Sequence, residues 1–227
     1  MTTTTPHYEE GSEAKIAVVL SCPGQEEEKA QKPAAGQSGE NLKEVLSNLR
    51  NIYGLNDFEI GKITITNAWD KVEYKGKTPN KPTRTEADDK EILGENNLNR
   101  LADEIKDITD FILCCGNKAK IAVLALQQQG KLNQNCGIIE VPHLGNQGTN
   151  KTIKEDVSGD RIISGDKTRS SSNRILRLEV VAKKIYEQIV FQKKIKEVIE
   201  DWKLRISTLY SSVKNWLGST SGIVKNR

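Results

Sequence analysis

Residue types that do chemistry follow three short apolar runs of this 227-residue chain. The turn Ser21–Gly24 follows the first run, Asn67 and Asp70 follow the second, and His143 follows a later one. In an open parallel sheet, ligands bind beyond the carboxyl ends of the strands. An isolated histidine is more often a hydrogen-bonding residue than a catalyst. The prediction of a site therefore rests on the convergence of these side chains at one edge of a sheet.

Four apolar runs are predicted to be the strands that position these residues. They are Lys15–Leu20, Ile63–Ile65, Asp110–Cys115 and Gly137–Val141. The runs are continuously apolar and do not alternate with polar residues, which is typical of parallel strands covered on both faces. Turn residues end three of them, including Gly116 and Pro142.

Helical periodicity lies between the strands. Apolar residues recur at helical spacing over Ser38–Tyr53, Thr85–Ile108 and Asn117–Gln129. The alternation of strands and helices predicts an α/β fold, a three-layer α/β/α sandwich with a central four-stranded parallel sheet.

The domain organisation follows from changes in composition along the chain. We expect a flexible N-terminus over residues 1–12 and one domain over residues 13–206, with a long polar loop over residues 144–173. A long helical pattern begins at Arg174 and is expected to break near Ser207 or Ser211. Residues 207–227 are predicted to form a C-terminal helical extension.

Composition and charge restrict the class of protein. Charged residues make up 29% of the chain and hydrophobic residues 36%, which is typical of a folded chain. No run of apolar residues is long enough to span a membrane, and the Thr-rich, acidic start does not read as a signal peptide. Residues 1–150 carry a net charge of −5 and residues 151–227 carry +8. The basic third indicates either a surface that faces a polyanion or a solvated Lys-rich helix.

Cysteine spacing points to a cytoplasmic protein without a metal site. The four cysteines, Cys22, Cys114, Cys115 and Cys136, include no C-x-x-C pair. Such cysteines are expected to be free thiols in a reducing cytosol. We predict no zinc, no iron–sulfur cluster and no other cofactor.

Four segments in order resemble the motifs of the uracil-DNA glycosylase superfamily. Pro23-Gly24, an acidic run that includes Glu27, and the pair Gly36 and Gly39 resemble its first motif. The segments Ile65–Ala68, Cys115–Ala119 and the loop at His143 are similar to its later motifs. The closest similarity is to the iron–sulfur, thermophilic-type branch, and it runs from about residue 15 to residue 146.

The resemblance implies roles for individual residues. Asn67 matches the asparagine that reads the flipped base, and His143 matches the histidine that stabilises negative charge on the departing base. Glu27 matches an acidic residue of the first motif. Ser21, Cys22, Pro23, Gly24, Ala34 and Asn67 are the residues expected to surround the substrate.

Departures from the family pattern affect catalysis. Ser21 and Cys22 stand where the branches carry a water-activating Glu, Asp or Asn, so Asp70 or Glu27 is the candidate that positions water instead. Asp70 is equally expected to be a turn cap. Ala34 stands where the family has a stacking Phe, which predicts either a wider pocket or a tighter backbone path.

The polar loop follows His143 where the superfamily places its DNA-inserting segment. The residues expected to contact DNA are Leu144, Asn146, Lys151, Lys167, Arg169 and Arg174, with Leu144 or Ile162 as the wedge. The competing interpretation is a disordered insertion whose charges only aid solubility.

These observations predict a DNA glycosylase that acts on double-stranded DNA and leaves an abasic site. The expected base is a bulky modified pyrimidine such as glucosylated hydroxymethylcytosine in phage DNA, which would make the enzyme a defence against viruses. The alternatives are a uracil-DNA glycosylase of base excision repair and a degenerate module that binds nucleic acid without cleaving it. We favour a monomer.

Overall fold

The computed structural model describes residues 4–76, 84–162 and 172–221, without the side chains of residues 215–221. Within it the chain forms two compact units, Met1–Glu187 and Gln188–Arg227. The predicted site lies wholly in the first unit. The division falls inside the range that we expected to form one domain.

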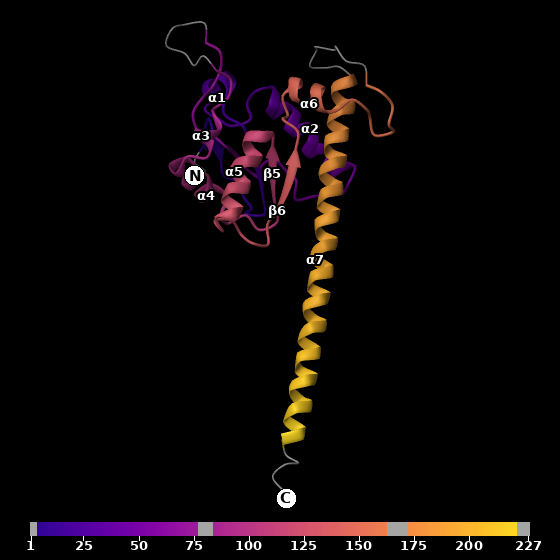
Figure 1. The fold of residues 1–227 in the computed structure, drawn as a ribbon. Helices are drawn as coiled ribbons and strands as arrows, with labels where there is room; N and C mark the ends of the chain where they lie inside the picture. The colour runs from indigo at the N-terminus through magenta and orange to yellow at the C-terminus, as the bar shows by residue number, and fades with distance from the viewer. Residues whose placement is uncertain (1–3, 77–83, 163–171, 222–227) are drawn as a thin grey trace, which may run out of the picture. The chain divides into compact units, whose positions relative to one another are not determined.

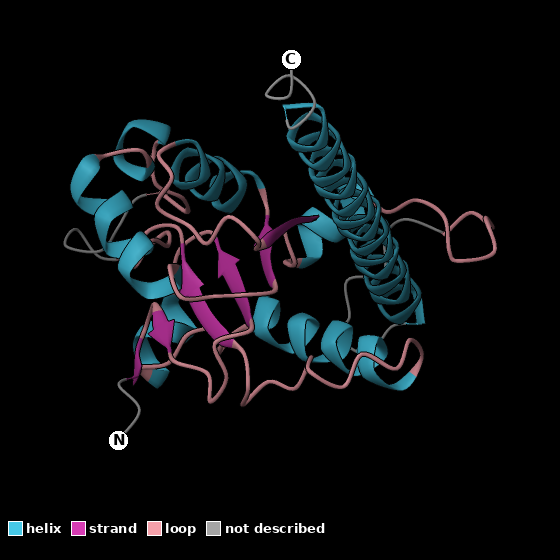
Figure 2. Ribbon diagram, turned by 90° about the horizontal axis from the view of Figure 1, so that it is seen from below, coloured by secondary structure: helices cyan, strands magenta, loops and turns pink. Residues whose placement is uncertain are grey.

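A six-stranded sheet forms the centre of the first unit, in the order β1-β2-β4-β3-β5-β6 (Figures 1 and 2). The four strands at β4-β3-β5-β6 are parallel, as predicted. They are β3 (Ile16–Leu20), β4 (Thr64–Asn67), β5 (Phe111–Cys115) and β6 (Gly137–Val141). Strands β3, β4 and β5 are buried along their whole length, which explains their unbroken apolar sequences.

The prediction of a four-stranded sheet is wrong in its strand number. Two short strands, β1 (Thr4–Thr5) and β2 (Tyr8–Glu9), pair antiparallel and extend the sheet beside β4. They lie in the segment that we expected to be a flexible N-terminus. Two-residue strands are too short to show a hydrophobic period, so the sequence does not reveal them.

Helices cover both faces of the sheet, which makes the expected three layers (Figure 2). They are α1 (Gln25–Ala30), α2 (Gln37–Asn51), α3 (Asp89–Ile92), α4 (Glu95–Ile105), α5 (Asn117–Gln128) and α6 (Asn146–Thr152). Apolar side chains of α3, α4 and α5 pack with Ala17 and Val19 of β3 in one buried cluster. This cluster holds the strand ends in place.

Three helical segments differ from the sequence prediction. The single helix expected over Thr85–Ile108 is two helices, because the chain turns at Gly94 between α3 and α4. The polar segment 144–173 contains the helix α6. The helix α7 runs over Ser172–Ser221 without a break at Ser207 or Ser211.

Candidate functional site

A cavity of about 340 Å³ opens at the carboxyl ends of the parallel strands. Leu20, Asn67 and Cys115 reach it from the last residues of β3, β4 and β5, and His143 reaches it from the loop after β6. The cavity brings together most of the residues that the sequence singled out: Ser21, Cys22, Gly24, Glu27, Asn67, His143 and Leu144.

The side-chain amide of Asn67 donates a hydrogen bond through its nitrogen and accepts none at its oxygen in the described part of the chain. The side chain is 1% exposed, and its Nδ2 donates a hydrogen bond to the backbone carbonyl of His7 at 3.2 Å. Since a carbonyl only accepts, this contact fixes the orientation of the amide. Its Oδ1 is buried without a hydrogen-bond partner in the described part of the chain. Asn67 therefore offers an acceptor.

His143 has one ring nitrogen assigned by a backbone contact. The N–H of Gly145 donates to Nδ1 of His143 at 3.0 Å. A nitrogen that accepts carries no proton, so the proton of the neutral ring is on Nε2. His143 is thereby prepared to donate from Nε2 to a group in the cavity.

Glu27 organises the loop on the other side of the first motif. Its two carboxylate oxygens accept hydrogen bonds from the N–H groups of Gly24 at 3.0 Å and Gly36 at 2.9 Å. This bidentate contact ties the start of α1 to the start of α2. Glu27 lies in the cavity as predicted, with both oxygens already engaged.

Ser21 and Cys22 are paired with residues that the sequence analysis did not identify. Oγ of Ser21 donates to the carboxylate of Glu86 at 3.2 Å, and Sγ of Cys22 donates to the carbonyl of Thr85 at 3.4 Å. Burial raises the pKa of the Cys22 thiol to about 12, and the nearby carboxylates of Glu86, Glu73 and Glu27 add to the shift. Cys22 is therefore a neutral thiol at physiological pH and not a thiolate base.

Glu73 is a buried carboxylate that closes one wall of the cavity. It is 8% exposed and accepts hydrogen bonds from Nε1 of Trp69 at 3.2 Å and from Arg84 at 2.6 Å. Its backbone N–H donates to the carbonyl of Pro23 at 2.9 Å. The backbone N–H of Glu73 thus holds the turn after β3, while its Oε1 accepts from both Trp69 and Arg84.

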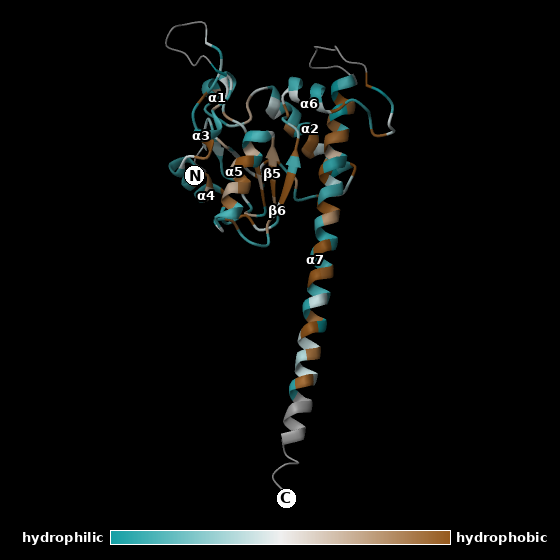
Figure 3. Ribbon diagram, viewed as in Figure 1, coloured by the Kyte–Doolittle hydropathy of each residue, from teal (hydrophilic) through white to brown (hydrophobic). Residues whose placement is uncertain are grey.

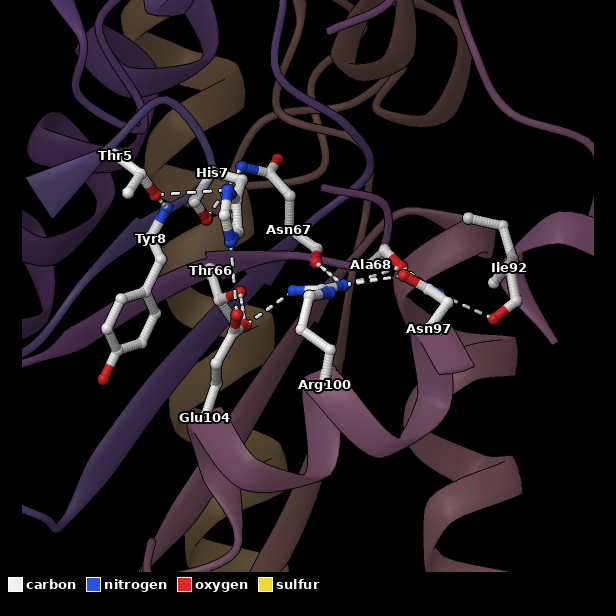
Figure 4. A network of polar contacts seen from close by, with 10 residues as sticks. All are labelled: Thr5, His7, Tyr8, Thr66, Asn67, Ala68, Ile92, Asn97, Arg100 and Glu104. Atoms are coloured by element: carbon white, nitrogen blue, oxygen red, sulfur yellow. Dashed lines mark hydrogen bonds and ion pairs between the residues drawn. The ribbon is translucent and has the colours of Figure 1, made fainter. Parts of the chain in front are cut away.

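The strand β4 that carries Asn67 is fixed by a polar network behind it (Figure 4). Arg100 donates to the carbonyl of Asn67 at 3.0 Å and to the carboxylate of Glu104 at 2.7 Å. Burial alone would raise the pKa of Glu104, but hydrogen bonds from His7, Thr66 and Arg100 and the charge of Arg100 together lower it. The network joins the N-terminal strands, β4 and α4.

Three of the predicted site residues do not line the cavity. Asp70 is half-buried beyond β4, and Pro23 contributes its backbone to the wall behind the turn. Ala34 is 8% exposed and has a left-handed backbone, with φ of 53°. A Cβ at Gly39 would stand 1.7 Å from the carbonyl oxygen of Ala34, so this turn is tightly packed.

The residues expected to contact DNA fall into different environments. Leu144 and Ile162, the two candidate wedges, are 1% and 5% exposed. Asn146 and Arg174 contact the buried Asn41, at 3.3 Å and 2.7 Å respectively. Lys151 is exposed on α6. Lys167 and Arg169 lie outside the described residues.

The residues that sequence reasoning missed share one property. Glu73, Thr85 and Glu86 reach the cavity from the connection between β4 and α3. This connection has no periodicity and matches none of the family motifs, so only the fold reveals that it returns to the strand ends.

The described residues contain neither a candidate metal site nor a candidate membrane-spanning helix. Among the described residues, no cluster of three or more His, Cys, Asp or Glu side chains is arranged to hold a metal ion. Over the same residues, no helix combines the length and apolar character needed to cross a membrane.

Comparison with known proteins identifies the family. The model of the uracil DNA glycosylase superfamily matches residues 6–159, which contain strands β2 to β6, helices α1 to α6 and every residue that lines the cavity. No curated protein matches the chain. The family match covers more than half of the sequence and includes Asn67 and His143. The chain belongs to the uracil-DNA glycosylase superfamily.

Proposed function

We propose that this protein is a DNA glycosylase that flips a modified cytosine out of double-stranded DNA and hydrolyses its N-glycosidic bond. Membership of the superfamily implies DNA glycosylase activity in general. The choice of base is our proposal, and glucosylated hydroxymethylcytosine of phage DNA is the base that we expect. Its removal leaves an abasic site, which would damage the genome of an infecting virus.

The orientation of Asn67 is the observation that carries this choice. Its Nδ2 is held by the carbonyl of His7, while its Oδ1 is buried without a partner. A buried acceptor without a partner costs about 1–3 kcal/mol, which a ligand that donates to it recovers. The exocyclic amine of cytosine is such a donor. Uracil has a carbonyl at that position and a donor only at its neighbouring N3–H, and the Nδ2 of Asn67 that would donate to the carbonyl is already engaged by His7.

The cavity volume also favours a base that carries a substituent. A volume of about 340 Å³ equals that of about eleven water molecules at roughly 30 Å³ each. This is more than a single pyrimidine ring occupies. This second line of support comes from the cavity as a whole and not from Ala34, which does not line it.

His143 supplies the donor that cleavage needs. When the C1′–N1 bond breaks, its electron pair leaves with the base, and negative charge develops on the base oxygen. The Nε2–H of His143 is available to that oxygen because Nδ1 is occupied by Gly145. One preorganised donor of this kind stabilises a transition state by about 2.7–4 kcal/mol.

The test compares base release from four otherwise identical duplexes. These contain uracil, cytosine, hydroxymethylcytosine or glucosylated hydroxymethylcytosine at one position, and alkaline strand cleavage measures abasic sites. We expect release of the glucosylated base, and none from the same duplex with an Asn67→Ala, His143→Ala double variant. Release of uracil alone would identify a repair enzyme. Binding of all four duplexes without release would identify a non-cleaving module.

A further inference from the structure

Hydrolysis in this cavity needs a group that activates water, and the usual positions do not provide it. Ser21 is a hydroxyl, and Cys22 is a thiol with a pKa of about 12. Four glutamates line the cavity: Glu26, Glu27, Glu73 and Glu86. The hydrogen bonds and ion pairs of these four glutamates show which of them is available to activate water.

Each of three of the four carboxylates accepts hydrogen bonds from two donors or forms an ion pair. Glu27 accepts from two backbone N–H groups, at Gly24 and Gly36. Glu73 is held by Trp69 and Arg84. Glu26 forms an ion pair with Lys29 at 3.0 Å.

Glu86 differs from the other three because its carboxylate accepts one hydrogen bond, from the neutral hydroxyl of Ser21. Its Oε1 accepts from Oγ of Ser21 at 3.2 Å, and no other side-chain contact of Glu86 is present in the described part of the chain. Ser21 directly follows β3 and is 6% exposed, so its position is fixed by the sheet. Glu86 itself is exposed, and water therefore reaches its second oxygen.

We propose that Glu86 is the catalytic carboxylate that orients and deprotonates the attacking water, with Ser21 as its positioning residue. This proposal rests on the proposed glycosylase function. The C1′–N1 bond breaks, and its electron pair leaves with the base, which His143 hydrogen-bonds. The water oxygen bonds to C1′, and the water proton passes to Glu86. Glu86 returns that proton to solvent, and the released base takes up a proton, so the sum is hydrolysis.

The test measures single-turnover base release and DNA affinity of the full-length protein separately. General base catalysis contributes about 10²–10⁴-fold. We expect Glu86→Gln to lower the rate by at least about 100-fold, with duplex affinity within about twofold of wild type. Glu95→Gln, a matched change at an exposed glutamate at the start of α4, is expected to retain the wild-type rate. Ser21→Ala is expected to give an intermediate loss.

Chemical rescue separates a catalytic role from a structural one. Glu86→Ala leaves space beside Ser21, so added azide is expected to attack C1′ and to restore release of the base, with a glycosyl azide left in the DNA in place of an abasic site. Full activity of Glu86→Gln alongside an active wild type would overturn this proposal alone. Absence of release by the wild type from every duplex would overturn the proposed function, and this proposal with it.

A second inference comes from the other compact unit and does not depend on catalysis. Apolar residues recur along the second half of α7 with alternating spacings of four and three (Figure 3). They are Ile195, Ile199, Trp202, Ile206, Leu209 and Val213, which are 41% to 66% exposed. A seven-residue repeat of this kind is the signature of a coiled coil and not of a helix that packs on a globular core.

The residue types along the repeat specify one kind of partner. Positions 199, 206 and 213 form one row of the seam, and all three are β-branched. The other row holds Ile195, Trp202 and Leu209. In parallel coiled coils, β-branched residues in the first row with Leu in the second favour two strands, and Leu209 is the position of the second row that has this residue type.

The flanking positions of a parallel pair bring no like charges together. In a parallel pair of identical helices, Phe191 faces Lys196 of the second copy, Val198 faces Lys203, and Arg205 faces Tyr210. Each flanking pair then joins one basic residue to one apolar or aromatic residue. We infer that residues 191–213 form a parallel two-stranded coiled coil with a second copy of this chain, in place of the monomer that we favoured from the sequence.

The test is the molar mass of the full-length protein in solution, measured by sedimentation equilibrium at tens of micromolar. We expect a dimer for the wild type and a monomer for the Ile199→Lys, Ile206→Lys variant. Leu204→Lys is the matched control, because Leu204 is 66% exposed but lies off the seam, and it is expected to remain dimeric. Leu209→Cys is expected to form a disulfide-linked dimer, as only a parallel pair aligns these residues. A monomeric wild type, a higher oligomer, or dissociation by Leu204→Lys would overturn the inference.

Discussion

The ring of His143 is enclosed by three glycines. A Cβ at Gly116 would stand 3.2 Å from the ring, one at Gly145 would stand 3.1 Å from it, and one at Gly148 would stand 2.8 Å from Cβ of His143. Larger residues at these positions would push the imidazole away. The loop after β6 thus fixes both the position of His143 and, through the N–H of Gly145, its tautomer.

Asn67 and His143 are expected to act on the base and not on the fold. Replacement of either by Ala should lower single-turnover base release by at least about tenfold, because each removes one preorganised polar contact to the base. Thermal unfolding of each variant is the control. Base release at the wild-type rate by either variant would remove that residue from the mechanism.

Sequence reasoning found the residues that belong to motifs and missed those that do not. Asn67 is the last residue of β4 and His143 lies two residues beyond the end of β6, so the apolar strand sequences predict where both residues lie in the fold. Glu73 and Glu86 come from an irregular connection. Their arrival at the cavity depends on long-range packing that no local pattern encodes. Glu86 and Glu27 differ in the hydrogen bonds that their carboxylates accept, and these hydrogen bonds likewise form only in the folded chain.

At the scale of elements, long apolar runs were the most predictable part of the fold. The four parallel strands agree closely with their predicted positions, because burial on both faces demands continuous apolar sequence. The short elements β1, β2 and α6 were not predictable, since tertiary contacts stabilise them more than local propensity does. One consequence is that the N-terminal segment reaches Asn67 through the carbonyl of His7.

Glu104 joins that N-terminal segment to β4 and α4, and its replacement by Gln tests the junction. The lowered pKa of Glu104 means that its charged form stabilises the fold. We expect Glu104→Gln to reduce the free energy of unfolding at neutral pH by about 1–3 kcal/mol, because Arg100 loses its charged acceptor.

The pH dependence of that difference has a defined sign. A group with a lowered pKa contributes stability above its ordinary value of 4.5, and the contribution is lost as pH falls through the lowered value. The urea-unfolding free energies of wild type and Glu104→Gln should therefore converge in acid. Asp103→Asn, an exposed carboxylate on the same helix, is the control and should change stability by less than about 1 kcal/mol. A gap that persists unchanged in acid would contradict the assignment.

At the scale of the whole molecule, charge is distributed unevenly along the chain. Residues 151–227 carry a net charge of +8, against −5 for residues 1–150. Two sets of basic residues are candidates for contact with the phosphates of the DNA backbone. One lies on α6 and the segment after it, and includes Lys151 and Arg161; the other lies on α7 and includes Lys193 and Lys194. Arg174 is a weaker candidate than the sequence indicated, since it hydrogen-bonds Asn41.

Salt dependence of DNA binding distinguishes the two sets. Each lost phosphate contact lowers the slope of log K against log salt by about 0.9. Lys151 and Arg161 are exposed and belong to the segment that follows His143, so we expect their joint replacement by Gln to weaken binding and to reduce the slope by nearly two contacts. The Lys193→Gln, Lys194→Gln variant carries the same change in net charge and is expected to keep the wild-type slope. If the slope falls in the second variant and not in the first, the helix α7 and not the segment after His143 holds the DNA backbone.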